Sequence, residues 1–580
     1  MSDRGERVDN GADAIWRTLG EEGVDVVFGY PGGAIMPAYD ALTRWPIHHV
    51  LTRHEQNAAH MADGYARASG KVGVAVATSG PGATNLVTGI ATAMLDSSPT
   101  VFITGQVPSS LIGTDAFQET DITGVTLPIT KHNYLVSRPE EVAPTLREAF
   151  EVARSGRPGP VVVDITKDAQ LGPAPAGAPS APRRGVRRPE VPVGRAALEQ
   201  AAALIARAER PLVFCGHGIV KAGASERLLE LVARADLPVA STLLGLGGFP
   251  ATHPRSLGMM GMHGEAWVNA AVQRADLIIA LGMRFDDRVT GNLATYARNA
   301  KKIHVELDPA EVDKNVRVDV PLVGDVREVL GELLPLVPER RCEAWNAEID
   351  AMRQDAARRD VLSLPDDGRL LGAHVIADLY ALTGGEALVV SDVGQHQMWE
   401  AQYYKHDRPR SLLTSGGLGT MGFALPAAMG ARFARPTDDI WVIAGDGGFQ
   451  MSAPELSTCR QEGLKLNIAI INNGYLGMVR QWQELFYERR YVATPILSPD
   501  FVKLAEAHGL TGLRVERRAD IPETVARARA TEGTVVIDFR VQAEDFVYPM
   551  VPAGNDLADM IRRPLPPSAG SGAIEGGETS

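Results

Sequence analysis

Two polar residues that each follow an apolar run have the types and spacing to hold one metal ion. Asp446 comes directly after the run Trp441–Gly445, and the Asn pair ending at Asn473 closes a second run, Leu466–Ile471. Both runs are short and contain β-branched residues, which predicts buried strands, and the stretch Ala453–Glu462 between them predicts a helix. A helical crossover makes the two strands parallel, so their carboxyl ends meet at the sheet edge where open α/β sheets bind ligands. We therefore expect both side chains to reach one cation.

The chemistry of this pair favours magnesium bound together with a phosphate group. A carboxylate, an amide oxygen and a backbone carbonyl suit Mg²⁺, which takes few protein oxygens and keeps positions for water and phosphate. Gly445, Gly447 and Gly448 flank Asp446 and would let a diphosphate approach the backbone closely. Taken alone, a Gly-Asp-Gly segment is also typical of an ordinary turn. The strand context and the Asn pair favour the metal–diphosphate interpretation.

Gly445-Asp446-Gly447 followed by Asn472-Asn473 resembles the signature of the thiamine diphosphate (ThDP) enzymes. The resemblance implies that Asp446, Asn473 and the carbonyl oxygen of Tyr475 are Mg²⁺ ligands. It also implies that the cofactor is contacted by Gln395, His396, Gly419, Met421, Gly445, Gly447, Gly448, Leu476, Gly477 and Met478. By residue type alone Met421 is more typical of core filler. The family places this Met under the cofactor, where it enforces a bent conformation.

The elements that must position these residues form three predicted domains. Helical and β-branched segments alternate, which predicts an α/β fold of three doubly wound domains with mainly parallel sheets over residues 11–170, 194–338 and 370–554. Residues 171–193 are predicted to be a linker, residues 339–369 a connecting segment and residues 565–580 a disordered tail. Predicted strands in the first two domains are Val24–Phe28, Lys71–Thr78, Thr100–Thr104, Val161–Ile165, Leu212–Cys215, Leu277–Leu281 and Lys302–Leu307.

The overall composition is that of a globular protein and disfavours nucleic acid or an anionic membrane as a main partner. The 580 residues carry a formal net charge of −13, with a pI near 5.6. The 3 cysteines, Cys215, Cys342 and Cys459, show no metal or redox spacing and are interpreted as reduced thiols of a cytoplasmic protein. No run of about 18 apolar residues occurs, and the N-terminus does not resemble a signal peptide.

Glu55 is the candidate acid/base residue. The segment Val50–Ala59 runs from a short strand into a helix that reaches Ala68 and is stopped by Gly70, which places Glu55 in the first helical turn. A favourable interaction with the helix dipole also explains a Glu at such a place. The resemblance implies instead that Glu55 bonds nitrogen 1′ of the cofactor's pyrimidine and drives an acid/base relay through the cofactor. Further implied contacts of ThDP are Pro81 and Asn85.

Segments around Glu55 narrow the resemblance to the catalytic subunits of the acetohydroxyacid synthase (acetolactate synthase) family. The matching segments are Phe28–Ala34, Arg53–Arg67, Thr78–Gly82 and Gly105–Pro108. The resemblance extends from about Asp13 to Gly554, so it is more specific than any single motif. It implies a first domain that binds the ThDP pyrimidine, a central domain that binds FAD, and a last domain that binds diphosphate and Mg²⁺.

The central domain resembles the FAD-binding domain of the biosynthetic branch of that family. Gly216-His217-Gly218 alone is typical of a tight turn or an imperfect dinucleotide loop, and the family often has Gly where this chain has His217. The segment Arg284–Arg288 favours the biosynthetic branch, because the catabolic acetolactate synthases lack it. In that branch FAD is mainly structural, since the carboligation involves no net oxidation. The implied FAD-binding residues are Gly216, His217, Gly218, Thr242, Leu243, Gly261, Met262, His263, Gly282, Arg284, Asp286, Arg288, Glu306, Asp308, Asp325 and Val326.

Arg288 and Trp482 are the candidates for recognising a second substrate. By residue type alone, Arg288 could be a surface partner of a neighbouring Asp, and Trp482 an anchor on a helix face. The resemblance implies that Arg288 holds the carboxylate of the second 2-keto acid and that Trp482 packs against the extra methyl of 2-ketobutyrate. Other implied positions are Gly33, whose amide would steady an oxyanion, Gln118 and Lys167 as catalytic residues, and Phe117 and Ala34 as substrate contacts. For Phe117, Gln118 and Lys167, packing or surface roles stay open.

The activity that the resemblance implies is the decarboxylation of pyruvate and transfer of the remaining two-carbon unit to a second pyruvate or to 2-ketobutyrate, in branched-chain amino acid biosynthesis. In this family Glu55 and Asp446 would come from different subunits, which implies a homodimer as the minimum active unit, or a homotetramer. A separate small regulatory subunit is a further implied partner. The alternatives are another ThDP enzyme, such as a pyruvate oxidase or a glyoxylate carboligase, and a non-catalytic nucleotide-binding protein. Glyoxylate carboligase lacks the catalytic Glu, so Glu55 argues against it.

Overall fold

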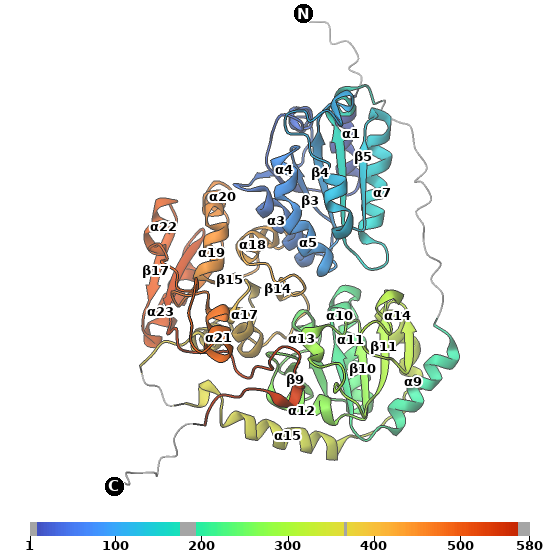
Figure 1. Cartoon of the computed structure of the whole chain (residues 1–580), viewed down its shortest axis with the longest axis vertical. Coiled ribbons are helices and arrows are strands. Elements are labelled where there is room, and N and C mark those ends of the chain that lie inside the picture. The colour runs from blue at the N-terminus through green and yellow to red at the C-terminus, as the bar shows by residue number, and fades with distance from the viewer. Residues whose placement is uncertain (1–8, 175–192, 365–367, 566–580) are drawn as a thin grey trace, which may run out of the picture.

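The computed structural model describes residues 9–174, 193–364 and 368–565. Figure 1 shows three α/β units, with the first (blue) above the central one (green) and the last one (yellow to red). Most of the predicted linker, 171–193, and nearly all of the predicted disordered tail, 565–580, lie outside the described residues.

Each unit is built on one six-stranded sheet whose paired strands are all parallel, which confirms the predicted fold class. The strand orders are β2-β1-β3-β4-β6-β5, β12-β11-β10-β7-β8-β9 and β14-β13-β15-β16-β18-β17. The direction of winding reverses between β1 and β3, between β10 and β7, and between β13 and β15. Doubly wound sheets bind ligands at the carboxyl ends of the strands beside such a reversal.

The strands are short and mostly buried on both faces, as parallel sheets require. In the first sheet they are β1 Val26–Gly29, β2 His48–Leu51, β3 Gly73–Ala77, β4 Thr100–Gln106, β5 His132–Val136 and β6 Pro160–Thr166. In the second they are β7 Pro211–Cys215, β8 Val239–Ser241, β9 Ser256–Met259, β10 Leu277–Leu281, β11 Lys301–Glu306 and β12 Val320–Val323. In the third they are β13 Leu388–Ser391, β14 Leu412–Thr414, β15 Ile440–Gly445, β16 Asn467–Asn472, β17 Thr511–Val515 and β18 Val535–Arg540.

Helices connect these strands and cover the sheets. The first unit has α1 Gly11–Glu21, α2 Met36–Leu42, α3 Glu55–Ser69, α4 Pro81–Asn85, α5 Val87–Leu95, α6 Ile122–Thr126, α7 Val142–Arg154 and α8 Lys167–Leu171. The central unit has α9 Arg195–Arg207, α10 His217–Ala222, α11 Ser225–Ala235, α12 Ala266–Arg274, α13 Asp287–Thr290 and α14 Val326–Leu333, followed by α15 Glu343–Ala357. The last unit has α16 Gly372–Thr383, α17 Gln395–Tyr403, α18 Ala424–Ala434, α19 Asp446–Ser452, α20 Leu456–Gln461, α21 Gly477–Phe486, α22 Phe501–Ala507 and α23 Ile521–Ala530. None of the helices within the described ranges combines the length and apolar character that a bilayer span needs.

The first and last units share one hydrophobic core, in which α3 packs against α18. Glycines allow the two helices to touch: a Cβ on Gly64 of α3 would lie 2.0 Å from the carbonyl oxygen of Ala427, and one on Gly430 of α18 would lie 1.9 Å from that of Met61. Helix α3 itself starts at Glu55 and ends at Ser69, before Gly70, which has the positive φ of 80° that glycine adopts without strain. Glu55 is thus the first residue of a helix held firmly against the last unit.

The structure corrects one predicted helix. The crossover between β15 and β16 was expected over Ala453–Glu462, but its first helix, α19, begins at Asp446, directly after the strand. The predicted stretch is itself helical, but the prediction missed α19 because Gly447 and Gly448 are poor helix formers whose cost tertiary packing overrides. A 3₁₀ turn, Ala453–Glu455, then separates α19 from α20. The parallel pairing of β15 with β16 is as expected, with Gly445 beside Ile471.

Candidate active site

A cavity of about 1220 Å³ lies where the three units meet. Its walls come from the carboxyl ends of strands in the second and third sheets and from two segments of the first unit, 95–97 and 154–158. The winding reversals between β10 and β7 and between β13 and β15 both open onto it. This is the place where doubly wound sheets bind ligands.

Asp446 and Asn473 lie on this cavity at neighbouring strand ends. Asp446 is 1% exposed, and its Oδ2 accepts hydrogen bonds from the Gly474 amide and the Ser498 hydroxyl, each over 3.1 Å. Burial raises the pKa of Asp446 to about 6, so the carboxylate is mostly ionised at neutral pH. Asn473 Oδ1 accepts from the Tyr475 amide over 3.0 Å, and its Nδ2 donates to Gln395 Oε1 over 3.2 Å. The side chains are therefore fixed by their own hydrogen bonds.

The available donor atoms here are oxygens, which fit Mg²⁺. One carboxylate, one amide oxygen and the nearby Tyr475 carbonyl leave room for water and phosphate, as Mg²⁺ prefers. Within the described ranges no cluster of three or more His, Cys, Asp or Glu forms a softer or more highly charged metal site. Helices α17, α19 and α21 begin on this cavity wall, at Gln395, Asp446 and Gly477. Their free N–H groups favour an anion such as a diphosphate.

His396 holds the glycine that precedes Asp446. Its Nε2 accepts a hydrogen bond from the Gly445 amide over 3.2 Å. Burial lowers the pKa of His396 to about 3, so the ring is neutral and can accept. A Cβ on Gly445 would lie 2.9 Å from the ring, which makes glycine necessary at this contact.

The loop 414–422 forms another part of the wall and carries Gly419 and Met421. Gly419 and Gly422 have positive φ angles of 72° and 85°, which favour glycine. The Gly422 amide donates to Asp392, with 2.9 and 3.1 Å to its two carboxylate oxygens. Met421 faces the Asp446 side of the cavity, with its Cε 3.7 Å from where a Cβ on Gly447 would stand.

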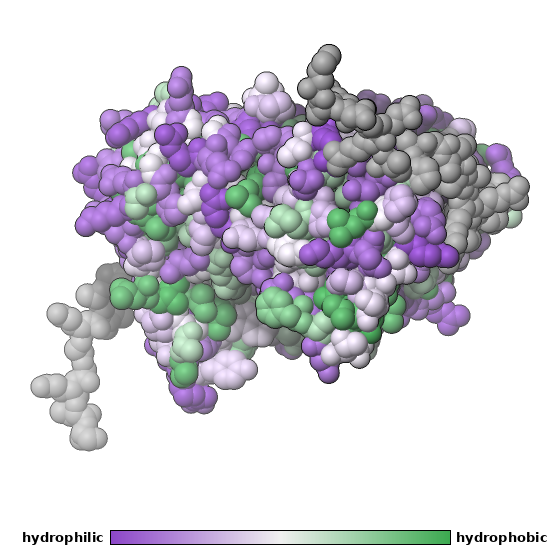
Figure 2. All heavy atoms as spheres, turned by 90° about the horizontal axis from the view of Figure 1, so that it is seen from above, coloured by the Kyte–Doolittle hydropathy of each residue, from purple (hydrophilic) through white to green (hydrophobic). Residues whose placement is uncertain are grey.

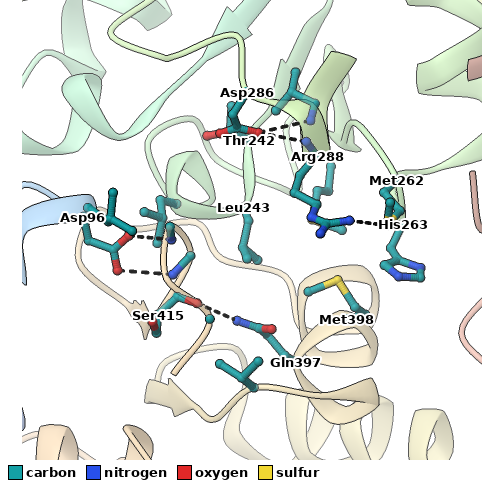
Figure 3. A pocket seen from close by; sticks show the side chains of 18 of the residues that line it. Asp96, Thr242, Leu243, Met262, His263, Asp286, Arg288, Gln397, Met398 and Ser415 are labelled. Carbon is teal, nitrogen blue, oxygen red and sulfur yellow. Dashed lines mark hydrogen bonds between the residues drawn. The ribbon is translucent and has the colours of Figure 1, made fainter. Parts of the chain in front are cut away.

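The remaining part of the cavity collects most of the residues expected to bind FAD. Their backbone forms a tight cradle: a Cβ on Gly218 would lie 2.6 Å from Gly282 Cα. Figure 3 shows Asp286 accepting from the backbone amides of Arg288 and Val289, over 3.1 and 3.3 Å, with Arg288 reaching toward Met262 and His263. His263 is buried with an unpartnered Nδ1, so a donor or acceptor is still available there. Cavity size, glycine cradle and unpartnered ring nitrogen together fit a flavin dinucleotide.

The cavity includes the expected residues of the last unit and most of those of the central unit. Its lining contains Gln395, His396, Gly419, Met421, Gly445, Asp446, Gly447, Gly448, Asn473, Tyr475, Leu476, Gly477, Met478 and Trp482. It also contains His217, Gly218, Thr242, Leu243, Met262, His263, Gly282, Arg284, Asp286, Arg288, Glu306, Asp325 and Val326. Gly216, Gly261 and Asp308 do not line it. Gly216 and Gly261 are packing positions, where a Cβ would lie 2.2 Å from the carbonyl oxygens of Gly282 and Arg288 respectively.

Several cavity residues were not among the sequence-based candidates. Arg157 donates to Ser97 Oγ over 2.8 Å and pairs with Glu311 over 3.0 Å. Lys221 of α10 donates to the Ser97 carbonyl oxygen over 2.8 Å, and burial lowers its pKa to about 7. Asp96 also lies on the wall. The one local sequence signal for these residues was the basic side chain of Arg157 just before β6. The sequence around the others predicts no cavity position, because this part of the wall is made by packing between units.

The Glu55 group lies apart from this cavity. Glu55 Oε2 accepts a hydrogen bond from Asn85 Nδ2 over 2.9 Å, and Pro81 begins α4 beside it. The Ala34 amide donates to Thr78 Oγ1 over 3.2 Å, and Gly33 is exposed with open space where a Cβ would be. None of the expected residues of the first unit lines the cavity; these are Gly33, Ala34, Glu55, Pro81, Asn85, Phe117, Gln118 and Lys167.

The loop 116–119 presents two of these residues in an unusual way. Phe117 is 88% exposed, and Gln118 has a positive φ of 60°, a conformation that costs a non-glycine residue free energy. Gln118 packs against Gly80, where a Cβ would lie 2.9 Å from Gln118 Cβ. Lys167 begins α8 at the end of β6 and is half-buried. One chain therefore carries two separated groups of candidate residues.

Comparison with known proteins identifies all three units. The family "Thiamine pyrophosphate enzyme, N-terminal TPP binding domain" matches residues 9–125, the central domain of the same enzymes matches 198–333, and the C-terminal TPP binding domain matches 392–539.

Full-length relatives share about half of their residues with the chain. The acetolactate synthase large subunit of Mycobacterium tuberculosis is 50% identical over 572 residues, covering 96% of this chain and 92% of the relative. That of Corynebacterium glutamicum is 48% identical over 562 residues, covering 95% and 90%. A probable acetolactate synthase large subunit of Methanocaldococcus jannaschii is 45% identical over 575 residues, covering 95% of each. The chain therefore belongs to the thiamine pyrophosphate enzymes and, within them, to the acetolactate synthase large subunits.

Proposed function

We propose that the chain makes acetolactate at a site to which its own cavity contributes the Mg²⁺, diphosphate and flavin positions, and a second copy of the chain contributes Glu55. When bound, ThDP would supply a nucleophilic carbon for the keto group of pyruvate and an acceptor for the electron pair released with carbon dioxide. The two-carbon unit passes to a second pyruvate, giving 2-acetolactate, or to 2-ketobutyrate, giving 2-aceto-2-hydroxybutyrate. Both products are early intermediates of branched-chain amino acid biosynthesis.

One observation carries the proposal: the starts of three helices meet around Asp446 and Asn473 on a cavity large enough for two cofactors. Asp446, Asn473 and the Tyr475 carbonyl would hold Mg²⁺, and the helix N–H groups would bind the diphosphate. Three proposed domains follow: residues 11–170 for the pyrimidine, residues 194–338 for FAD, and residues 370–554 for the diphosphate and Mg²⁺.

Glu55 is the proposed acid/base residue. Its carboxylate is held by Asn85 at the start of α3, so it has a fixed direction. A carboxyl group bonded to the pyrimidine nitrogen can hold and return the proton that the cofactor needs for activation. Pro81 and Asn85 would contact the same ring. Gly33, whose surroundings are open, would donate its amide to the developing oxyanion.

The second substrate is proposed to bind between Arg288 and Trp482. The Arg288 side chain is 59% exposed, and its polar contacts with the described residues are 3.2 Å to Met262 Sδ and 3.7 Å to Asp287. The ion pair of Arg288 with Asp287 is too long and too exposed to occupy the guanidinium. The guanidinium can therefore donate two hydrogen bonds to a substrate carboxylate. Trp482 lines the same cavity and packs edge-on against Phe486, with ring centroids 5.7 Å apart. Its ring offers an apolar wall for the methyl group of 2-ketobutyrate.

FAD is proposed to fill the central part of the cavity. Three features support a ligand with both polar and aromatic parts. They are the close contact of Gly218 with Gly282, the Asp286 carboxylate that accepts from the Arg288 amide, and the buried ring of His263. The reaction moves no electrons to an acceptor, so FAD would act by filling and ordering this space. His217 lines this part of the cavity, and its Nδ1 bonds the Leu244 carbonyl oxygen over 2.7 Å, which fixes the ring against the wall.

Two copies of the chain are needed in this proposal. The Glu55 group lies off the cavity of its own chain, and both groups are bordered by exposed apolar side chains, among them Phe117 and Leu127 (88% and 68% exposed) and Val492 and Leu497 (71% and 98%). Figure 2 shows hydrophobic side chains gathered in patches along one edge of the face seen from above. Exposed apolar patches of this kind mark interfaces. A homodimer, or a homotetramer built from it, would cover them.

A small regulatory subunit is a further proposed partner. The relatives from Mycobacterium tuberculosis and Corynebacterium glutamicum are named as large subunits, which supports a second, smaller chain in the complete enzyme.

The test is an incubation of the chain with pyruvate, ThDP, Mg²⁺ and FAD in which acetolactate and oxygen are measured together. We expect acetolactate without matching oxygen uptake. Oxygen loss equal to pyruvate consumed would instead identify a pyruvate oxidase, and an absence of both would refute the proposal.

A further inference from the structure

The C-terminal end of α5 holds the loop that carries Gly419 and Met421 at two points. Thr92 Oγ1 bonds Thr420 Oγ1 over 2.7 Å. One turn further on, Asp96 Oδ1 accepts from the Gly417 amide over 2.7 Å and Oδ2 from the Gly416 amide over 3.2 Å. Thr92 lies on α5, and Asp96 is the residue that caps the C-terminus of this helix; both are buried, and their spacing of four places them on the same side of it. Figure 3 shows Asp96 beside the loop that contains Ser415.

Arg67 fixes the orientation of Asp96. Its Nη2 donates to Asp96 Oδ2 over 2.8 Å, its Nε and Nη2 donate to Asp63 over 2.7 Å each, and its Nη1 donates to the Thr414 carbonyl oxygen over 2.7 Å. The side chains of Arg67 and Asp96 are 3% and 0% exposed. In a buried site such a paired carboxylate cannot rotate without leaving charges and amides unsatisfied. The loop is therefore held by a rigid group.

The residue after Asp96 belongs to the flavin part of the cavity. Ser97 has a positive φ of 58°, its carbonyl oxygen accepts from Lys221 and its hydroxyl from Arg157. Asp96, Ser97, Lys221 and Arg157 all line the cavity. A change in the position of Ser97 is transmitted to Asp96 because the two are adjacent and α5 is a stiff element. The end of α5 thus contacts the proposed flavin space on one side and the thiamine loop on the other.

We propose that Thr92 and Asp96 are positioning residues for the cofactor-binding loop, and that Asp96 couples the occupancy of the flavin part of the cavity to the affinity for ThDP. This inference rests on the proposed function, because it takes ThDP and FAD as the ligands. It gives a non-redox flavin a physical role. FAD holds Lys221, Arg157 and Ser97 in place, and Asp96 passes that order to Gly416 and Gly417.

The test measures ThDP binding by calorimetry at fixed Mg²⁺, with and without FAD, so that activity is not the readout. Asp96→Asn removes the charge that Arg67 requires and leaves one loop amide without its acceptor. We expect ThDP to bind roughly 10- to 100-fold more weakly. In the unaltered chain FAD should tighten ThDP binding severalfold, and ThDP should tighten FAD binding by the same factor. In Asp96→Asn that factor should approach one.

Two further variants separate positioning from general destabilisation. Asp13→Asn removes a buried carboxylate of α1 that pairs with Arg44 away from the cavity, and it should leave both affinities unchanged. Thr92→Val is nearly isosteric and leaves the ion pairs of Asp96 and Arg67 intact, so it replaces Asp96→Asn as the test if that variant does not fold. Thr92→Val should weaken ThDP binding severalfold. Normal ThDP binding and normal coupling in the Thr92 and Asp96 variants would overturn the inference. Failure of the unaltered chain to bind ThDP would overturn the proposed function instead.

Discussion

The polar side chains on the cavity wall differ in charge because their surroundings differ. Asp446, with a pKa raised to about 6, is mostly ionised at pH 7, which would give the proposed Mg²⁺ site one negative ligand. His396, with a pKa lowered to about 3, is neutral and accepts from a backbone amide. Lys221, with a pKa lowered to about 7, can respond to an anion bound near it. Burial thus shifts the pKa of each residue differently, so that the residues have different charges within one cavity.

Glu55→Gln tests the acid/base role directly. Glutamine keeps the oxygen that accepts from Asn85, so the start of α3 should be preserved, but it cannot exchange a proton. We expect exchange of the thiazolium carbon 2 proton of bound ThDP, followed by NMR, to slow by about 100-fold or more. Glu21→Gln, an exposed carboxylate paired with Arg147, is the control and should exchange normally. Near-normal exchange in Glu55→Gln would remove the role assigned to Glu55.

Trp482→Leu tests the recognition of the second substrate. The smaller side chain loses contact with an ethyl group, and a methylene in an apolar pocket is worth about 1–3 kcal/mol. We expect the preference for 2-ketobutyrate over pyruvate to fall roughly tenfold or more while acetolactate is still made, as the product ratio with both substrates present will show. Leu485→Ala, on the same helix but off the cavity wall, should keep the ratio. An unchanged ratio in Trp482→Leu would contradict the assignment.

At the scale of the elements, the site depends on how helices begin and how closely they pack. Helices α17, α19 and α21 start at the sheet edge, and their first residues line the cavity. Helix α3 carries Glu55 at its first residue and is locked against α18 through Gly64 and Gly430. The positions of the candidate residues therefore follow from helix starts and from one close helix crossing.

Gly64→Ala tests that crossing. The added Cβ would lie 2.0 Å from the Ala427 carbonyl oxygen, and backbone cannot move aside as a flexible side chain can. We expect a loss of about 1–3 kcal/mol in unfolding free energy, seen as a lower urea midpoint. Gly20→Ala is the matched control, since Gly20 sits in α1 with nothing within 4 Å and alanine is the better helix former. Equal midpoints for the two variants would show that the crossing carries no constraint.

The residues that follow buried strands could be predicted from the sequence, and those that depend on packing between units could not. Asp446 and Asn473 each follow an apolar run that forms a central strand, so their meeting follows from strand direction alone. Strand β12, at a sheet edge, alternates buried and exposed residues and was not predicted. Asp96, Arg157 and Lys221 were missed because their neighbours come from other units. Helix α19 was missed because two glycines near its start contradict local helix propensity.

At the scale of the whole molecule, one chain holds the two halves of the proposed catalytic site in different places. The cavity gathers the residues expected for Mg²⁺, diphosphate, FAD and the second substrate, whereas Glu55 and its neighbours lie off it. Two copies related by a two-fold axis would bring the Glu55 group of each to the cavity of the other, since such an interface repeats every contact twice. Each dimer would then contain two sites, and each site would need both chains.

A mixed dimer tests this account most directly. Glu55→Gln and Asp446→Asn, each expected to be inactive alone, are co-expressed with different tags and purified as the heterodimer. One of its two sites then combines an intact Glu55 with an intact Asp446, so we expect acetolactate formation at about half the rate of the unaltered dimer. If both residues act within one chain, every site of the heterodimer contains a lesion, and a rate no higher than that of either parent variant would contradict the account.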